Sequence, residues 1–214
     1  MCGIFGARTS RSFVELYLLN RERGDFSYGG LYYKKDLITI IKNKDDMSSL
    51  VPHGYNIYLG HTRAPTNSTT YFNFNEAHPF IYGDWCVGHN GIILNFNDLK
   101  EKYNIPNNVD SSCIPFLLSK GNQYIEEDAI KWTLEQLDGI YACWMFNLYS
   151  SNLYLVRCGS PIFYDCILKQ FSSISNKSAN DVLLKEGLIY KSNSYFDEPQ
   201  VMGEFKFNSP YLTS

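Results

Sequence analysis

The sequence predicts an α+β layered sandwich, in which two stacked and mainly antiparallel sheets are covered by helices. Two observations support this fold class. Pairs of aromatic and β-branched runs are joined by short turns, as in β-hairpins. Segments in which apolar residues recur at helical spacing stand between and after those hairpins, and such helices are expected to cover the sheets.

The chain is expected to begin with a strand over residues 2–7 and a helix over residues 10–21. The two glycines of the strand allow another backbone to approach closely. Ser10 can cap the helix, because a hydroxyl at this position accepts a hydrogen bond from a free backbone N–H. The helix should bury one face, which is formed by Phe13, Leu16, Tyr17 and Leu19.

The next predicted elements are a hairpin, a single strand and a loop. A glycine-rich turn leads into the hairpin, whose strands cover residues 31–33 and 37–41. A third strand covers residues 56–62. Residues 64–77 are dense in Asn, Thr and Ser, and this composition indicates a loop.

The middle of the chain is predicted to contain a second hairpin and three helices. The hairpin has strands at residues 78–82 and 85–89, and its second strand runs directly into Asn90-Gly91. The helices are expected at residues 97–103, 110–120 and 126–137.

Two strands follow at residues 140–148 and 153–158, and their nearly continuous apolar character indicates burial on both faces. Beyond them the pattern weakens, with short strands at residues 162–164 and 188–191 and a helix near residues 180–184. We find no internal repeat or linker, so the 214 residues are expected to form one domain.

Composition and charge exclude several classes of function. The net charge is −3, and Lys and Arg do not cluster as direct nucleic-acid binding requires. The sequence has no apolar run of membrane-spanning length and no export signal, so we expect no membrane contact and a cytoplasmic chain with reduced thiols. The four histidines and six cysteines lack metal-ligand spacing, so neither a metal nor a cofactor is expected.

The first residues of the chain offer a nucleophile. If Met1 is removed, Cys2 carries both a thiol and a free α-amino group. The ordinary pKa of a thiol is about 8.5 and that of an α-amino group about 8, so the amine can accept the proton of the thiol. Taken alone, these residues also fit a buried cysteine at the start of a strand.

Five separated pieces of the sequence occur in one characteristic order. They are residues 2–6, Arg23-Gly24 with Ser27 and Gly29, Gly60-His61-Thr62-Arg63 with Thr66, Ala77-His78-Pro79 leading to residues 89–95, and Asp110. Together they resemble the class II glutamine amidotransferase domain, an N-terminal-nucleophile (Ntn) hydrolase, and most of all the glutaminase domain of glucosamine-6-phosphate synthase. The resemblance covers roughly residues 2–165 and implies a four-layer α/β/β/α sandwich of the Ntn-hydrolase type.

The resemblance implies a catalytic set formed by Cys2, Asn90 and Gly91. Cys2 would attack the side-chain amide of L-glutamine, release ammonia and form a γ-glutamyl thioester. The side-chain amide of Asn90 and the backbone N–H of Gly91 would stabilise the oxyanion that develops during attack.

A second set of residues would bind the head group of glutamine. The planar fork of Arg63 matches a carboxylate, and the Thr66 hydroxyl can add a donor. Asp110 would hold the ammonium group, although the same side chain also fits a simple helix cap. The remaining residues expected to shape the pocket are Arg23, Gly24 and His89.

Three departures from the family pattern lie close to these residues. After Arg23-Gly24, Asp25 precedes Phe26, whereas the family usually has an acidic residue one place later. Ala64-Pro65 follows Arg63, where an aromatic residue is common in the family. Ser111-Ser112 follows Asp110, where Thr and Glu are common. By itself, the Asn90-Gly91 pair is also a signature of a hairpin turn.

These observations predict a glutaminase subunit that makes ammonia from L-glutamine. The sequence contains no second, synthetase domain, so the ammonia is expected to pass to a separate acceptor enzyme, for amidation of a sugar or of a nucleobase precursor. One alternative is an Ntn hydrolase of a different amide, against which the pair Arg63 and Asp110 argues. The other is a catalytically silent binding or scaffold subunit, which would not need a free thiol at Cys2.

Overall fold

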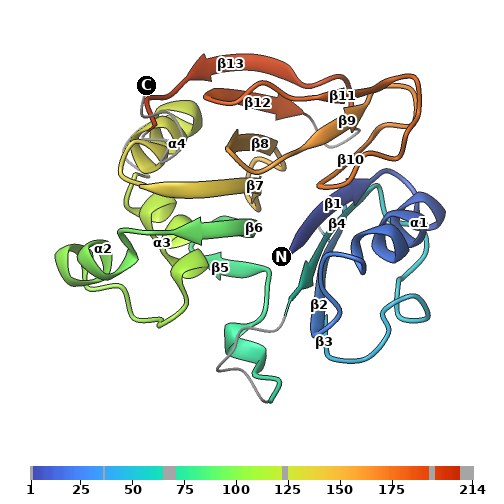
Figure 1. The fold of residues 1–214 in the computed structure, drawn as a ribbon, viewed down its shortest axis with the longest axis horizontal. Coiled ribbons are helices and arrows are strands. Elements are labelled where there is room, and N and C mark those ends of the chain that lie inside the picture. Colours follow the sequence, from blue (N-terminus) through green and yellow to red (C-terminus); the bar gives the residue numbers. More distant parts are fainter. Residues whose placement is uncertain (1, 36, 65–70, 122–124, 193–195, 208–214) are drawn as a thin grey trace.

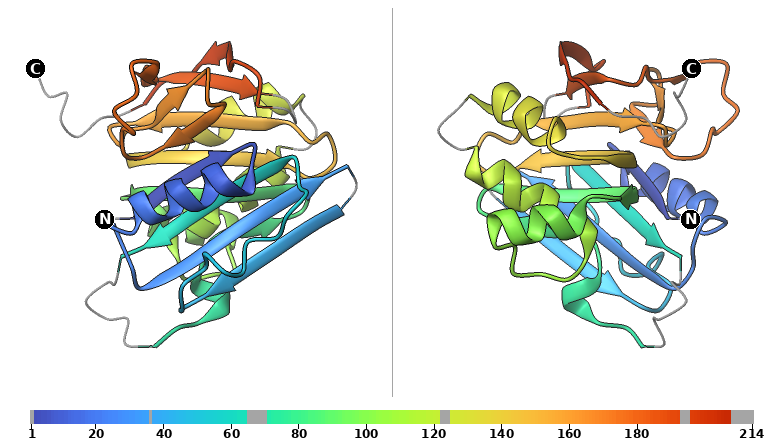
Figure 2. Two further views of the ribbon diagram at one scale, coloured as in Figure 1. Left: turned by 90° about the vertical axis from the view of Figure 1, so that its right-hand side faces the viewer. Right: turned by 60° about the vertical axis from the view of Figure 1, so that its left-hand side comes forward.

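Two antiparallel sheets lie face to face, with helices on their outer sides (Figure 1). The computed structural model describes residues 2–35, 37–64, 71–121, 125–192 and 196–207. Side views show that helix α1 covers one sheet and that helices α2, α3 and α4 cover the other (Figure 2). The predicted α/β/β/α sandwich is therefore confirmed.

The first sheet has seven strands in the order β11-β9-β10-β1-β4-β2-β3. Strand β1 lies inside this sheet, paired with β4 on one side and with β10 on the other. The seven strands are β1 (Gly3–Ala7), β2 (Ser27–Lys34), β3 (Leu37–Asn43), β4 (Ile57–Arg63), β9 (Phe163–Asp165), β10 (Gln170–Ser172) and β11 (Asp181–Leu183).

The second sheet has six strands in the order β13-β12-β8-β7-β6-β5. Strands β7 and β8 lie in its centre, which confirms the burial on both faces that their apolar sequences predict. The six strands are β5 (Phe80–Tyr82), β6 (Trp85–Ile93), β7 (Gly139–Asn147), β8 (Leu153–Cys158), β12 (Leu188–Ser192) and β13 (Gln200–Glu204).

Helix α1 (Ser10–Asn20) packs on the seven-stranded sheet, and its N-cap is Thr9, whose hydroxyl accepts a hydrogen bond from the Ser12 N–H. The other helices are α2 (Phe96–Tyr103), α3 (Cys113–Lys120) and α4 (Glu126–Leu134), with short 3-10 helices η1 (Phe74–Glu76) and η2 (Asp110–Ser112). In the part of the chain that the structure describes, no helix is long and apolar enough to cross a membrane.

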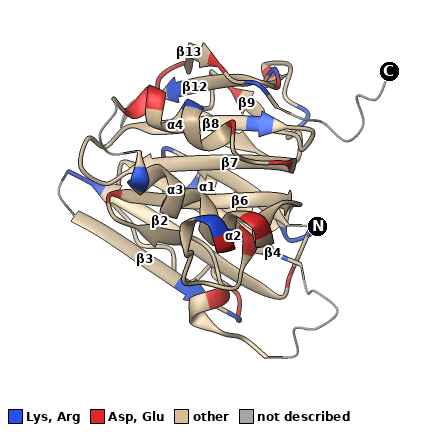
Figure 3. Cartoon of the chain, turned by 90° about the vertical axis from the view of Figure 1, so that its left-hand side faces the viewer, with Lys and Arg blue, Asp and Glu red and all other residues tan. Residues whose placement is uncertain are grey.

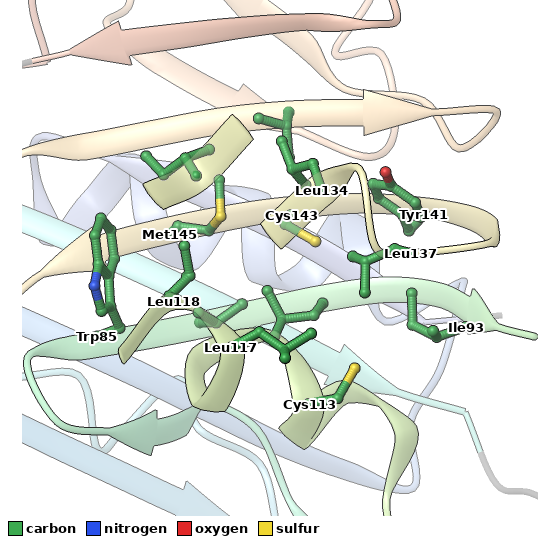
Figure 4. Close-up of a cluster of buried hydrophobic side chains, with 14 of the residues drawn as sticks. Trp85, Ile93, Cys113, Leu117, Leu118, Leu134, Leu137, Tyr141, Cys143 and Met145 are labelled. Carbon is green, nitrogen blue, oxygen red and sulfur yellow. The ribbon is translucent and has the colours of Figure 1, made fainter. Parts of the chain in front are cut away.

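The hydrophobic core forms three layers, one in each space between neighbouring layers of the sandwich. Side chains alternate along each strand, so Ile4 faces the second sheet while Phe5 packs on Phe13 of α1. The layer between α3, α4 and the second sheet contains Trp85, Leu117 and other large side chains (Figure 4). The burial of these side chains, each worth roughly 1.5–3 kcal/mol, holds the sandwich together.

Basic and acidic positions are interspersed along the chain on the side of the molecule drawn in Figure 3. Lys and Arg are not gathered there into one patch. Ion pairs are placed at the surface, for example between Arg21 and Asp46. Such exposed pairs contribute little to stability, so the apolar layers dominate the energetics of the fold.

Several predicted boundaries differ from the structure. The helix expected near residues 180–184 is wrong, because this segment is strand β11 and pairs with β9. Strand β2 begins at Ser27 rather than at residue 31, and Gly29 lies inside it. A Cβ on Gly29 would lie 1.8 Å from the carbonyl oxygen of His78, so the glycine allows a close backbone approach. Helix α4 ends at Leu134 instead of residue 137.

Candidate active site

The predicted nucleophile, Cys2, stands immediately before β1, where this strand lies beside the end of β4. Gly3 pairs with Thr62 across the two antiparallel strands, so Cys2 lies next to Arg63 at this end of the pair. Arg23 Nε donates a hydrogen bond of 2.7 Å to the carbonyl oxygen of Cys2. Strand pairing and this hydrogen bond together fix the backbone that carries the thiol.

The environment of the Cys2 thiol keeps it protonated. Burial raises the pKa of the thiol above its ordinary value. A hydrogen bond from the Ala64 backbone and the positive charge of Arg63 act in the opposite direction, whereas the negative charge of Asp110 raises the pKa further. A protonated thiol is a weak nucleophile, so attack by Cys2 on a substrate needs a base.

Arg23 and Gly24 lie in the turn after α1 and contact the backbone around the thiol. A Cβ on Gly24 would lie 2.3 Å from the Ala64 nitrogen and 2.5 Å from the carbonyl carbon of Arg63. Only glycine lets the turn pack so closely on this segment. The predicted role of Arg23 and Gly24 in shaping a glutamine pocket stays a prediction.

Arg63 is the last residue of β4, and its guanidinium is held on two sides. Its Nη1 donates a hydrogen bond of 3.0 Å to the carbonyl oxygen of Glu76. The guanidinium carbon also lies 5.8 Å from the centre of the Phe26 ring, a cation–π contact. Thr66 lies outside the described residues, so its predicted contact with a carboxylate stays a prediction.

Asn90 and Gly91 lie within strand β6 and do not form a turn. The pairing of β6 with β7 continues past them to Ile93, which lies opposite Gly139. The hairpin-turn alternative is therefore wrong. Gly91 has φ +147°, and a Cβ on it would lie 2.0 Å from the carbonyl oxygen of Ile140, so this position requires glycine.

Ser173 connects Asn90 with the first strand. Its hydroxyl oxygen accepts hydrogen bonds from the Ile4 backbone N–H, at 3.0 Å, and from Asn90 Nδ2, at 3.4 Å. The Ser173 N–H in turn donates to the Ile4 carbonyl oxygen, at 2.8 Å. Asn90 is thus tied to the strand that follows directly on Cys2.

Asp110 is the first residue of η2, and its carboxylate accepts three hydrogen bonds. Oδ2 accepts from the Ile93 N–H at 3.0 Å, and Oδ1 accepts from the Ser111 N–H at 2.7 Å and from the Ser111 hydroxyl at 3.2 Å. The carboxylate therefore stabilises its own turn, and its charge also reaches Cys2.

Three buried histidines lie behind these residues. His61 Nε2 is 2.9 Å from the His89 carbonyl oxygen, and the His61 ring stacks on His78 with ring centres 3.7 Å apart. Burial lowers the pKa of His61 to about 3 and lowers the pKa values of His78 and His89 as well. The three rings are therefore neutral at pH 7. His89 Nδ1 bonds with the Ser111 hydroxyl at 2.7 Å.

Sequence reasoning missed two buried polar residues beside the site, Ser173 and Asn20. Asn20 Nδ2 donates hydrogen bonds of 2.8 Å to the Leu16 carbonyl oxygen and to the Ser172 hydroxyl. The backbone carbonyl oxygen of Asn20 accepts a hydrogen bond from the Thr62 hydroxyl. A signal existed for Asn20, since it falls on the same helical face as Leu16. Ser173 stands in a serine-rich stretch that gives no comparable signal.

The arrangement places several of the predicted site residues around one end of β1. The charges of Arg63 and Asp110 both act on the Cys2 thiol, and Asn90 is hydrogen-bonded to Ser173, which in turn bonds with Ile4 of β1. Among the described residues, no group of three or more His, Cys, Asp or Glu side chains is placed to hold a metal ion.

Curated proteins are similar in sequence to most of this chain. A glutamine–fructose-6-phosphate aminotransferase from Listeria innocua is 31% identical over 179 residues, which are 76% of this chain and 30% of the relative. The corresponding enzyme from Francisella tularensis subsp. tularensis is 28% identical over 182 residues, which are 76% of this chain and 29% of the relative. The chain belongs to the class II glutamine amidotransferases.

Solved structures agree with this assignment at the level of the fold. A glutamine phosphoribosylpyrophosphate amidotransferase from B. subtilis superposes with a TM-score of 0.74 at 18% identity, over 95% of this chain and 50% of that one. A glutamine aminotransferase class-II domain protein from Silicibacter pomeroyi has a TM-score of 0.61 at 13% identity, over 98% of this chain and 100% of that one.

The amidotransferase chain spans only 29% and 30% of the two curated relatives described above. No protein-family profile matches it. The relatives' names describe aminotransferases that use glutamine and fructose 6-phosphate.

Proposed function

We propose that this chain hydrolyses L-glutamine to glutamate and ammonia, with Cys2 as the nucleophile. The observation that carries the proposal is the position of Cys2 beside Arg63 at the end of the paired strands β1 and β4, where the charge of Asp110 also acts on the thiol. A guanidinium and a carboxylate beside one thiol complement the α-carboxylate and α-ammonium of a free amino acid. Their position favours glutamine over an amide that lacks this head group.

The base is proposed to be the α-amino group of Cys2 itself, exposed by removal of Met1. The Cys2 thiol is protonated at neutral pH because burial raises its pKa. The free amine takes the thiol proton as sulfur attacks the side-chain carbonyl carbon of glutamine. The C=O electron pair moves onto oxygen, and a tetrahedral oxyanion forms.

The oxyanion is proposed to be stabilised by Asn90 Nδ2 and the Gly91 N–H. Collapse of the intermediate breaks the C–N bond, and the amine base returns its proton to the departing nitrogen, which leaves as ammonia. A γ-glutamyl thioester remains on Cys2, and attack by water releases glutamate and the thiol. Loss of one oxyanion donor ordinarily lowers the rate by about 10²–10³.

The test is glutamate release from L-glutamine by the purified chain, with intact mass recorded on the same sample to follow Met1. Wild-type protein is expected to release glutamate, and Cys2→Ala is expected to release none. Cys166→Ala is the matched control, because Cys166 is an exposed free thiol and should be dispensable. Equal release by Cys2→Ala and wild type would overturn the proposal.

The ammonia is proposed to pass to an acceptor enzyme on a separate chain. The curated relatives are named as aminotransferases that use glutamine and fructose 6-phosphate, which supports transfer of the released nitrogen to an acceptor. The purified chain, given L-glutamine and fructose 6-phosphate, should release free ammonia and form no amino sugar. Formation of amino sugar by this chain alone would contradict a separate acceptor.

A further inference from the structure

A row of hydrogen bonds between buried groups runs from β4 through β6 to η2, behind the proposed glutamine site. It begins with His61 Nε2, which lies 2.9 Å from the His89 carbonyl oxygen. It continues from His89 Nδ1 to the Ser111 hydroxyl at 2.7 Å, and from that hydroxyl to Asp110 Oδ1 at 3.2 Å. His89 and Ser111 are 2% and 4% exposed, so water competes little for these bonds.

The Asp110 carboxylate at one end of the row determines which group donates in each hydrogen bond between Asp110 and His89. A carboxylate only accepts hydrogen bonds, so the Ser111 hydroxyl donates its proton to Asp110. The Ser111 oxygen then accepts from His89, which must carry its proton on Nδ1. The assignment leaves Nε2 of His89 as a bare lone pair, and this nitrogen is buried without a hydrogen-bond partner among the described residues.

The row also limits how Asp110 can receive a ligand. A carboxylate offers roughly four acceptor sites. Three of them are taken by the Ile93 N–H, the Ser111 N–H and the Ser111 hydroxyl. These three donors come from β6 and η2, so they fix the plane of the carboxylate between two elements of the fold.

We propose that Ser111, held by His89, is a positioning residue that aims the Asp110 carboxylate at the ammonium group of glutamine. The inference rests on the proposed function. Ser111 touches no reacting atom in this account, and its hydroxyl acts only through Asp110. Its removal should therefore weaken recognition of the ammonium group and leave the chemical step at Cys2 largely intact.

The test compares Ser111→Ala with Ser112→Ala on two substrates. Ser112 is the matched control, because its hydroxyl donates to the Val109 carbonyl oxygen and lies outside the row. The substrates are L-glutamine and glutaramate, which is glutamine without its α-amino group. Ser111→Ala should raise the KM for L-glutamine about tenfold, the effect of one hydrogen bond to a charged group, with kcat within about twofold.

The KM for glutaramate should be the same in Ser111→Ala and wild type, since this substrate has no ammonium for Asp110 to bind. Ser111→Thr, which keeps the hydroxyl, should restore the KM for L-glutamine. An equal rise in KM for both substrates would show a general structural effect and overturn the positioning role, as would unchanged kinetics. Absence of glutamate release by the wild type would instead overturn the proposed function.

A second measurement does not depend on the stability of any variant. Nitrogen-15 NMR of the imidazoles in the wild-type protein should show His89 protonated on Nδ1 and bare on Nε2. The opposite tautomer would remove the donor to Ser111 and overturn the row.

Discussion

Arg23 Nε donates a 2.7 Å hydrogen bond to the backbone carbonyl oxygen of Cys2. A residue in the turn after α1 thus anchors the peptide that carries the proposed nucleophile. The contact is to the main chain, so it fixes the position of Cys2 and leaves the thiol itself available to react.

Substitution of Arg23 by Ala is expected to lower kcat for glutamine hydrolysis about tenfold to a hundredfold. The physical reason is the loss of one hydrogen bond from a charged donor, worth about 1.5–3 kcal/mol, at the residue that must attack. Steady-state kinetics check the prediction. Arg21→Ala is the control, because Arg21 pairs with Asp46 at the surface. An Arg23→Ala enzyme with wild-type kcat would contradict the anchoring role.

Two glycines on the paired strands β6 and β7 should be intolerant of any side chain; Gly91 lies opposite Tyr141, and Gly139 lies opposite Ile93. Gly91 has φ +147° and Gly139 has φ +154°, and a Cβ on Gly139 would lie 2.1 Å from the carbonyl oxygen of Ile92. Gly139→Ala is expected to lower the free energy of unfolding by about 1–3 kcal/mol, the usual cost of such backbone strain, and to reduce glutaminase activity by displacing Gly91.

The matched control for this prediction is Gly203→Ala in β13, where an added Cβ would meet no atom within 4 Å. Urea unfolding of the two variants gives the comparison. If Gly139→Ala were as stable as Gly203→Ala, the close approach of β6 and β7 would not be required.

Acid should destabilise the fold through its buried histidines. Burial lowers the pKa of His61 in the folded protein to about 3, against an ordinary value of 6.5. Between these two pH values, His61 is protonated in the unfolded chain and neutral in the folded one. The stabilising contribution is therefore complete above about pH 6.5 and is lost as the pH falls toward 3. The loss is up to about 1.4 kcal/mol per pH unit for each such histidine.

The same prediction extends to His78, whose pKa is lowered mainly by burial, with further lowering by neighbouring positive charge such as that of Arg63 and Lys42. Unfolding free energies measured from pH 7 to pH 4 should fall less steeply in His61→Gln than in wild type. His53→Gln, at the protein surface, should keep the wild-type slope. An unchanged slope in His61→Gln would show that His61 is not a buried neutral group.

Most elements up to Cys158 could be predicted from the sequence, because long strands such as β7 and helices such as α1 repeat their apolar pattern several times. Strands β10 and β11 have three residues each, which is too short for any period to be recognised. Residues 181–183 form a strand only because they pair with β9, a contact that local sequence does not reveal.

The candidate site likewise contains residues that the sequence predicts and residues that only the structure reveals. Motifs pointed to Cys2, Arg63 and Asp110, since each residue type suits one group of glutamine. Ser173 could not be predicted, because its bond with the Ile4 N–H spans 169 positions in sequence. The twofold use of Asp110, as a hydrogen-bond acceptor for β6 and its own turn and as a charge that acts on Cys2, likewise needed the three-dimensional arrangement.

The most direct test of the account is to find which atom a glutamine-like electrophile modifies. The purified chain is incubated with a glutamine analogue that carries a diazoketone in place of the side-chain amide, and its N-terminal peptide is analysed by mass spectrometry. If Cys2 is the nucleophile, a single adduct should form on its sulfur, in a peptide that has lost Met1, and L-glutamine should protect against it. An unmodified Cys2, an adduct on another cysteine such as Cys166, or quantitative retention of Met1 in an active enzyme would contradict this role.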